Sequence, residues 1–97
     1  MSEPWTLDDP SEALDRWIAA EQPDDDLRRF IIVWLVGFDD PFVGDYDPVN
    51  PDAWSAVATK IPPNVEFPDQ CVVVAYRIDP AERRIVVDVI CNLSWPA

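Results

Sequence analysis

The chain contains no histidine and very little lysine, glycine or cysteine. Its 97 residues include two glycines, two cysteines and seven basic residues, of which Lys60 is the only lysine. Without histidine, acid–base catalysis lacks its most common side chain, and a cysteine nucleophile lacks the usual base that generates its thiolate. Two glycines are too few for a phosphate-binding loop. These absences favour a protein that is not an enzyme and that binds no cofactor.

Long apolar runs are also missing. The longest, residues 30–37, is far below the ~20 apolar residues that a bilayer-spanning helix needs. The first residues contain neither a basic region nor an apolar signal segment. We therefore expect a cytoplasmic protein that does not contact a membrane.

The length fits one small domain, residues 1–97. A chain of this size buries somewhat more than ~60% of its unfolded surface, which is enough to fold without a metal or a disulfide. Residues 1–9 are polar and contain Pro4. We expect them to form a flexible N-terminal arm.

Charge is abundant, and the 19 acidic residues far outnumber the seven basic ones. The formal net charge is −12; residues 1–26 hold nine acids and one base, and residues 39–52 hold five aspartates and no base. Such a surface repels phosphate backbones, because nucleic-acid affinity comes largely from cationic contacts. It attracts basic proteins. The charge predicts no direct nucleic-acid binding. It either favours a basic protein partner or only keeps a tryptophan-rich chain in solution.

A first helix is predicted to start at Asp9 and Pro10. Asp9 can cap the helix, and proline suits its first position. Gln22 and Pro23 then end it. Its apolar stripe consists of Ala13, Leu14, Trp17, Ile18 and Ala20.

A second helix is predicted from the aspartates at 24–26 to a left-handed cap at Gly37. Carboxylates favour the positive end of a helix dipole, and glycine is the usual residue at a left-handed cap. A strand is the competing interpretation, because four residues of the apolar run are β-branched. The two end signals favour the helix. The core stripe would be Leu27, Phe30, Ile31, Trp34 and Leu35.

This helix has more apolar side chains than one buried face can hold. Ile32, Val33 and Val36 lie off the core stripe, so the helix is either buried on all sides or docked on a partner or a second copy. We take these three residues, together with the acidic residues that precede them, as the candidate partner-binding site. The acidic members of the site are Asp24, Asp25 and Asp26.

Residues 38–70 are predicted to be mostly irregular, because six of the eleven prolines fall there. Residues 54–61 fit either a short strand or a helical turn. The aspartates of residues 45–52 suggest a calcium loop, but Val49 stands where the third alternating oxygen ligand belongs. We therefore predict no metal site.

The C-terminal third predicts an antiparallel hairpin of residues 71–78 and 85–91. Pairing Ile78 with Ile85 would place eight mainly apolar side chains on one face and set Arg77 diagonal to Asp88. The eight are Val72, Val74, Tyr76, Ile78, Ile85, Val87, Val89 and Cys91. In this register Cys71 and Cys91 lie on opposite faces, so we expect two free thiols. The predicted fold class is α+β, with two N-terminal helices packed on a small antiparallel sheet that ends in a β-hairpin.

Two segments carry a resemblance to a known family. They are Phe38-Asp39-Asp40-Pro41-Phe42 after the second helix, and Val73-Val74-Ala75-Tyr76-Arg77-Ile78-Asp79, which turns into Arg84-Ile85-Val86-Val87. With this order of elements, residues 11–91 resemble the toxins of the RelE/ParE superfamily. The expected first strand of that family is not visible in residues 1–9.

The resemblance implies an alternative function as a toxin that acts on ribosome-bound mRNA or on gyrase. Its catalytic residues would then be Tyr76, Arg77, Arg83 and Arg84. The basic cluster that such toxins use is missing, and no histidine replaces it. We therefore expect a protein-interaction module, either a catalytically silent RelE/ParE-like domain or an inhibitor of a basic partner.

Overall fold

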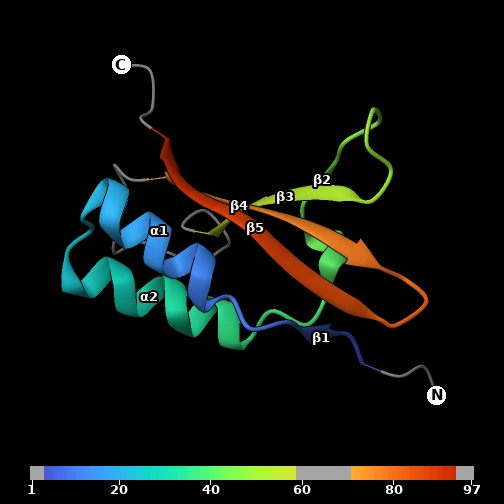
Figure 1. The fold of residues 1–97 in the computed structure, drawn as a ribbon, viewed down its shortest axis with the longest axis horizontal. Coiled ribbons are helices and arrows are strands. Elements are labelled where there is room, and N and C mark those ends of the chain that lie inside the picture. Colours follow the sequence, from blue (N-terminus) through green and yellow to red (C-terminus); the bar gives the residue numbers. More distant parts are fainter. Residues whose placement is uncertain (1–3, 59–70, 94–97) are drawn as a thin grey trace.

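The computed structural model describes residues 4–58 and 71–93, and it forms two layers (Figure 1). Helices α1 (Ser11–Glu21) and α2 (Asp25–Val36) cover one face of a five-stranded sheet with the strand order β1-β5-β4-β3-β2. The predicted α+β class, with N-terminal helices and a terminal hairpin, is confirmed. The sheet is mixed, however, because β1 runs parallel to β5.

Strand β1 (Thr6–Leu7) corrects the prediction of a flexible arm over residues 1–9. It pairs with Arg84 and Ile85, and the backbone N–H of Asp8 donates to the carbonyl of Ile85 at 2.9 Å. Leu7 packs against the core, and the Asp8 carboxylate accepts from Arg84 Nε at 2.9 Å. A two-residue strand is too short to show the alternation that identifies strands. Residues 1–3 lie outside the described residues.

Helix α1 begins one residue later than predicted. Pro10 occupies the cap position, and the Asp9 carboxylate accepts a hydrogen bond from the first helical amide at 3.0 Å. Gln22 ends the helix with a φ of 47°, in the left-handed region, before Pro23. Ala13 and Trp17 are buried, and Leu14 and Ile18 pack against the core, so most of the predicted stripe faces inward. Ala20 is exposed and does not belong to it.

Helix α2 confirms the helical interpretation of the apolar run. The Asp24 carboxylate accepts from the backbone N–H three residues on at 2.9 Å, as expected of an N-cap. The left-handed cap predicted at Gly37 is wrong, because its φ is −88°. The helix instead tightens at its end: the N–H of Phe38 donates to the carbonyl of Leu35 at 3.0 Å, which draws the buried Phe38 ring into the core.

Three short elements follow α2. They are the 3-10 helix η1 (Pro41–Val43), strand β2 (Asp45–Tyr46) and strand β3 (Ala53–Val57). Between the two readings of residues 54–61, the structure has a strand as far as residue 57, and residues 59–61 lie outside the described residues.

Strands β4 (Cys71–Asp79) and β5 (Arg84–Leu93) form the predicted hairpin. Ile78 lies opposite Ile85, as predicted. The predicted ion pair is also present, with 2.8 Å between Arg77 Nε and Asp88 Oδ2.

A β-bulge at Asp88 alters the second half of β5. Tyr76 lies opposite Val87 and Ala75 opposite Val89, so residue 88 is extra and the side-chain alternation reverses beyond it. Ile90 therefore faces the helices and is 5% exposed, whereas Val89 is 51% exposed. The predicted core positions of Val89 and Cys91 are wrong for this reason.

The bulge also changes the relation between the two cysteines. Cys91 lies opposite Val73, which places it on the same sheet face as Cys71 and not on the opposite one. Both thiols are free. Diagonal neighbours of this kind have Cα atoms about 7–8 Å apart, beyond the usual disulfide range. Burial raises the pKa of the Cys91 thiol, and the nearby Glu21 charge raises it further.

Candidate interaction surface

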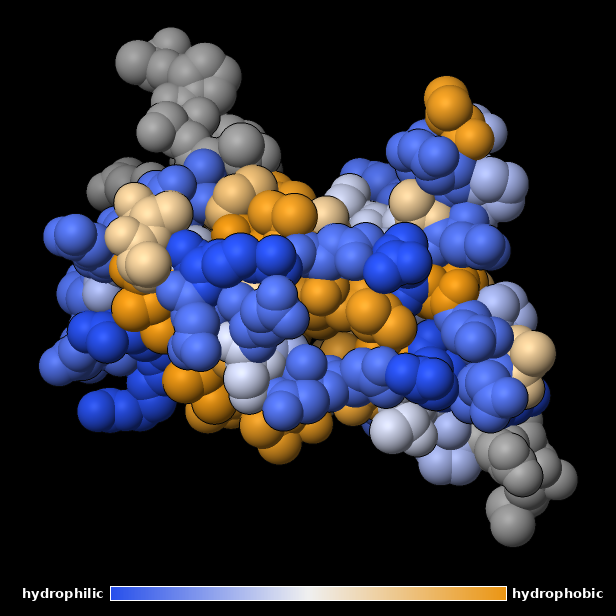
Figure 2. Space-filling model, in the orientation of Figure 1, coloured by the Kyte–Doolittle hydropathy of each residue, from blue (hydrophilic) through white to orange (hydrophobic). Residues whose placement is uncertain are grey.

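The outer face of α2 carries three aliphatic side chains that contact solvent. Ile32, Val33 and Val36 are 44%, 65% and 84% exposed. Leu27, Ile31 and Leu35 on the inner face are buried, as the core stripe predicts. Figure 2 shows the apolar side chains gathered at the lower edge of the molecule, along α2. The helix is therefore not buried on all sides, and we call Ile32, Val33 and Val36 the outer face of α2.

A groove adjoins this face at the C-terminal end of the helix. It has a volume of about 310 Å³ and opens between the last turn of α2 and η1. Val33 belongs to both the groove and the outer face. The lining residues are Val33, Trp34, Gly37, Phe38, Asp39, Asp40 and Val43. Val43 is 55% exposed, so the apolar surface of α2 continues across the groove onto η1.

Two aspartates form the polar rim of the groove. The Asp40 carboxylate accepts from the backbone N–H of Phe42 at 3.0 Å and caps η1. Asp39 is exposed beside it, and no ion pair holds either carboxylate in the part of the chain that the structure describes. The groove thus combines an apolar floor with negative charge at its edge.

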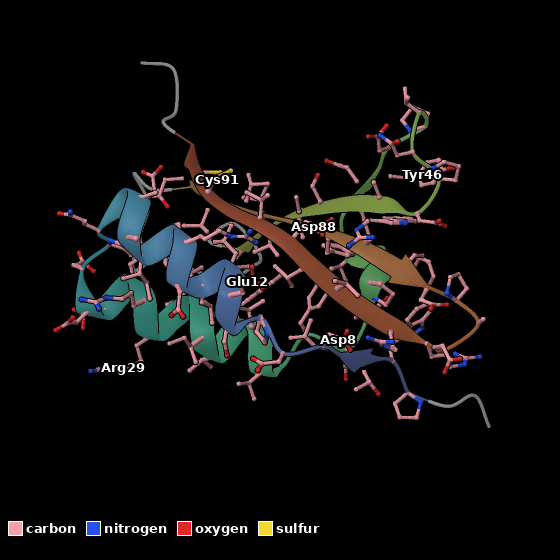
Figure 3. The ribbon with its side chains drawn as sticks, viewed as in Figure 1. Asp8, Glu12, Arg29, Tyr46, Asp88 and Cys91 are labelled. Atoms are coloured by element: carbon pink, nitrogen blue, oxygen red, sulfur yellow. The ribbon has the colours of Figure 1, made fainter. Side chains whose placement is uncertain are left out.

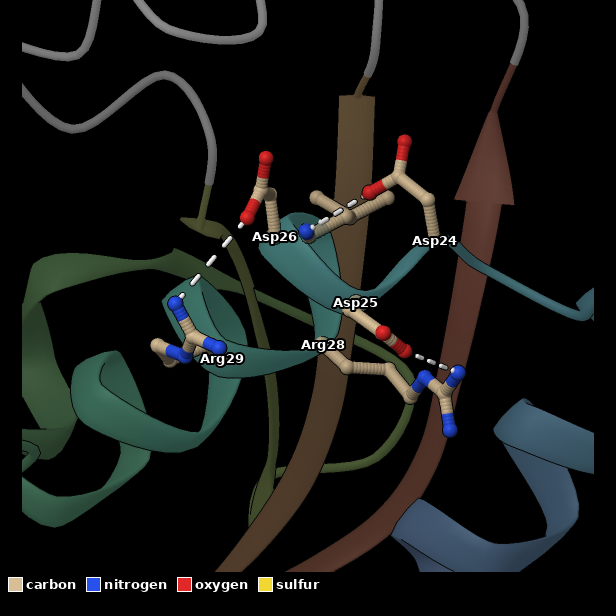
Figure 4. A network of polar contacts seen from close by, with 6 residues as sticks. Asp24, Asp25, Asp26, Arg28 and Arg29 are labelled. Carbon is tan, nitrogen blue, oxygen red and sulfur yellow. Dashed lines mark hydrogen bonds and ion pairs between the residues drawn. The ribbon is translucent and has the colours of Figure 1, made fainter.

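The predicted acidic members of the site lie at the other end of α2 (Figure 4). Asp24 caps the helix, Asp25 pairs with Arg28 at 2.6 Å, and Asp26 lies 4.0 Å from Arg29. A helix of this length spans about 18 Å, so these carboxylates are separated from Val36. Their contacts stabilise the start of the helix. The structure does not bring them to the groove, whose rim comes from Asp39 and Asp40 instead.

The four residues of the alternative catalytic site do not converge. Tyr76 faces the helices, is 1% exposed and donates its hydroxyl to the carbonyl of Pro41. Arg77 points to the other face of the sheet and pairs with Asp88. Arg84 donates from Nε to the Asp8 carboxylate at 2.9 Å, at the β1 edge of the sheet.

Arg83, the fourth of these residues, lies in the hairpin turn. Its guanidinium carbon is 6.0 Å from the ring centroid of Trp5. Burial raises the pKa of Tyr76 to about 12; the backbone N–H of Gly44 opposes this shift, and the charges of Asp40 and Asp45 add to it. A phenol that holds its proton this firmly is a poor base at neutral pH.

In the aspartate-rich loop of residues 45–52, the carboxylate of Asp47 accepts hydrogen bonds from its own loop. Asp47 accepts from the backbone N–H of Val49 at 2.9 Å and from the side chain of Asn50 at 3.2 Å. These hydrogen bonds lower the pKa of Asp47 and close a turn. Over residues 4–58 and 71–93, no three metal-ligating side chains come together. No helix in these ranges is long and apolar enough to cross a membrane.

Comparison with protein families, with curated proteins and with solved structures finds no match for this chain. The surface must therefore be interpreted from its own chemistry.

Sequence reasoning identified the outer face of α2 but missed its groove. The signal in the sequence was the pair of aspartates that follows Gly37 and Phe38, next to the short apolar segment Phe42-Val43. Only the tertiary fold shows that Val43 of η1 lines the same groove as Val33 of α2.

Proposed function

We propose that this chain is a small acidic protein-interaction module, and that the outer face of α2 and its groove dock an amphipathic helix from a basic partner protein. One observation carries the proposal: three exposed aliphatic side chains on one helix face adjoin a groove with a carboxylate rim. The proposal does not depend on the resemblance to RelE/ParE toxins.

The shape of the site suits a helix. A partner helix that lays an apolar stripe into a groove contributes anchors at i, i+3, i+4 and i+7. Val33 and Val43 flank the space that such an anchor would fill. Since Val33 and Val36 are mostly exposed, they contribute little to the stability of the monomer and are free to contribute to binding.

The charge favours a basic partner over a second copy. Each chain has a formal net charge of −12, so two copies repel each other, whereas lysine or arginine beside an apolar stripe could pair with Asp39 and Asp40. Electrostatic attraction of this kind raises the association rate and weakens as salt is added.

A designed helical peptide of leucine and lysine tests this proposal by isothermal titration calorimetry. Val33→Asp should weaken its binding about tenfold or more, because the new carboxylate is desolvated at the centre of the interface. Val49→Asp is the matched control, because Val49 is 82% exposed on the loop between β2 and β3. Both variants should melt within about 3 °C of the parent, since surface substitutions usually change stability by less than ~0.5 kcal/mol.

Two further measurements separate the parts of the proposal. A leucine–glutamate peptide of the same pattern should bind much more weakly, and Asp39→Asn should reduce the salt dependence of leucine–lysine peptide binding. Equal binding of the two peptides contradicts the basic partner. A dimer that light scattering detects at micromolar concentration, and that Val33→Asp dissociates, identifies a second copy as the occupant instead.

A further inference from the structure

A continuous row of four aromatic rings lies at the end of the molecule away from the start of α2. Ring centroids are 5.6 Å apart for Trp5 and Phe42, 5.3 Å for Phe42 and Trp54, and 5.3 Å for Trp54 and Tyr46. In Figure 3, Tyr46 lies at the upper right of the view and Arg29, near the start of α2, at the lower left. We call these four rings the aromatic row.

Four separate segments build the aromatic row. Trp5 precedes β1, Phe42 belongs to η1, and Tyr46 of β2 lies opposite Trp54 of β3. Phe42 and Tyr46 are 54% and 49% exposed, and both tryptophans are half-buried. The row is therefore a surface that presents ring area to solvent, and it shares no residue with the outer face of α2.

The surroundings of the row favour a cation. Residues 39–52 carry five aspartates, and no lysine or arginine occurs between Arg29 and Lys60. At one end of the row, the Arg83 guanidinium carbon already lies 6.0 Å from the centroid of the Trp5 ring. Ring faces attract cations through their quadrupole, and guanidinium groups are the most frequent partners. The Arg83–Trp5 pair is therefore an example, within this protein, of the cation–π contact that the exposed rings could make with an arginine of another chain.

The spacing of the row fits an extended peptide. Successive side chains on one side of an extended chain are about 6.6 Å apart, since each residue advances about 3.3 Å. The ring centroids follow one another at 5.3–5.6 Å. Alternate residues of an extended segment can therefore meet successive rings.

From this geometry we infer that the aromatic row binds an extended peptide segment with arginine side chains at alternate positions. Single-stranded nucleic acid is the other ligand that stacks on exposed aromatic rows. Nucleic acid needs cationic side chains to contact its phosphates. The aspartates around this row repel phosphates, so we favour the arginine peptide.

The test uses the synthetic peptide Gly-Arg-Gly-Arg-Gly-Arg-Gly and the indole N–H signals of the ¹⁵N-labelled full chain. Titration should shift the Trp54 signal, assigned with Trp54→Phe, and leave the Trp17 signal in place, because Trp17 lies on the buried face of α1 and is 1% exposed. Tyr46→Leu keeps an apolar side chain but removes the ring, and it should weaken binding about two- to fivefold. Tyr46→Phe should retain the affinity, and Val49→Leu is the control outside the row.

Several outcomes would overturn the inference. A matched peptide with glutamine in place of arginine that binds equally well shows that the cation is irrelevant. Equal binding by Tyr46→Leu and the parent removes the row from the site. An oligothymidine that binds more tightly than the arginine peptide identifies a nucleic-acid surface. Loss of peptide binding in Val33→Asp, with no loss in Tyr46→Leu, places the peptide on the outer face of α2 and leaves the proposed function standing.

Discussion

The two glycines of this chain should respond oppositely to alanine. Gly44 passes directly over the backbone of β3, and a Cβ atom built on it would lie 2.6 Å from the carbonyl carbon of Ser55 and closer still to its oxygen. The Tyr76 hydroxyl oxygen would be 3.0 Å away. Because Ser55 is paired to both neighbouring strands, its carbonyl cannot yield without disturbing the sheet.

Gly37 supplies the matched control. A Cβ atom there would meet only the carbonyl oxygens of Val33 and Trp34, both at 3.8 Å, which is ordinary contact. Its φ of −88° lies outside the left-handed region, so the backbone does not require glycine there. Gly37→Ala should therefore be neutral or stabilising by up to about 1 kcal/mol, because alanine reduces the entropy of the unfolded chain.

Gly44→Ala should lower the free energy of unfolding by about 3 kcal/mol, the upper end of the usual range for overpacking, because the obstacle is backbone and not a flexible side chain. At about 4–8 °C per kcal/mol for a domain of this size, the melting temperature should fall by roughly 12–24 °C. Urea unfolding followed by far-ultraviolet circular dichroism measures both variants. A loss below about 1 kcal/mol for Gly44→Ala, or a larger loss for Gly37→Ala, would refute the packing of η1 against β3.

Further predictions concern the Tyr76 hydroxyl, the Asp24 cap and the surplus of acidic residues. Tyr76→Phe should cost about 1–2 kcal/mol, because the buried carbonyl of Pro41 loses its donor. Since the fold raises the pKa of Tyr76 to about 12, stability should be complete below about pH 10 and decline toward pH 12, and pH-dependent melting should show a smaller decline in Tyr76→Phe. Asp24→Ala removes the N-cap of α2 and should lower the free energy of unfolding by about 1 kcal/mol in urea unfolding. Asp24→Asn can still cap the helix and should keep most of that stability. Calorimetry should show the melting temperature rising from ~0.01 to ~0.15 M salt, where the Debye length falls from ~30 to ~8 Å; a flat or falling value would mean that repulsion among the acids is negligible.

Local signals in the sequence were enough to predict most of the elements. The helix start at the aspartates of residues 24–26, the apolar stripe of α2 and the Ile78–Ile85 pairing all depend on residues close in sequence or on matching apolar faces, and all are present. The left-handed cap failed at Gly37 because the buried Phe38 sets the path of the chain there. Tertiary packing outweighed a local preference at that position.

The bulge at Asp88 could not be predicted from the alternation alone. Val86, Val87, Val89 and Ile90 are all apolar, so the pattern of β5 fits either face. What distinguishes the faces is a pair of long-range polar contacts. The Arg16 side chain donates to the carbonyl of Asp88 at 3.0 Å, and the Trp17 indole donates to the Asn92 side chain at 2.7 Å. Each joins α1 to a strand more than seventy residues away, which no local pattern records.

Of the candidate surfaces, one could be predicted from the sequence and two could not. The outer face of α2 could be predicted because a helix has a fixed period, and its residues lay off the core stripe. Neither the groove beside it nor the aromatic row could be predicted, because each is assembled from segments that meet only in the fold.

The composition of the outer face of α2 conflicts with the local requirements of a solvent-exposed helix. Ile32, Val33 and Val36 are β-branched, and each is less favourable in a helix by several tenths of a kcal/mol than alanine, glutamate or lysine at the same position. Val33 and Val36 are 65% and 84% exposed, so burial in the monomer offsets little of this cost for these two residues. Polar helix formers at Val33 and Val36 should therefore give a more stable and more soluble domain. When a sequence departs from local consistency without a gain in its own fold, the departure points to a functional site, and here it lies beside the carboxylates of Asp39 and Asp40.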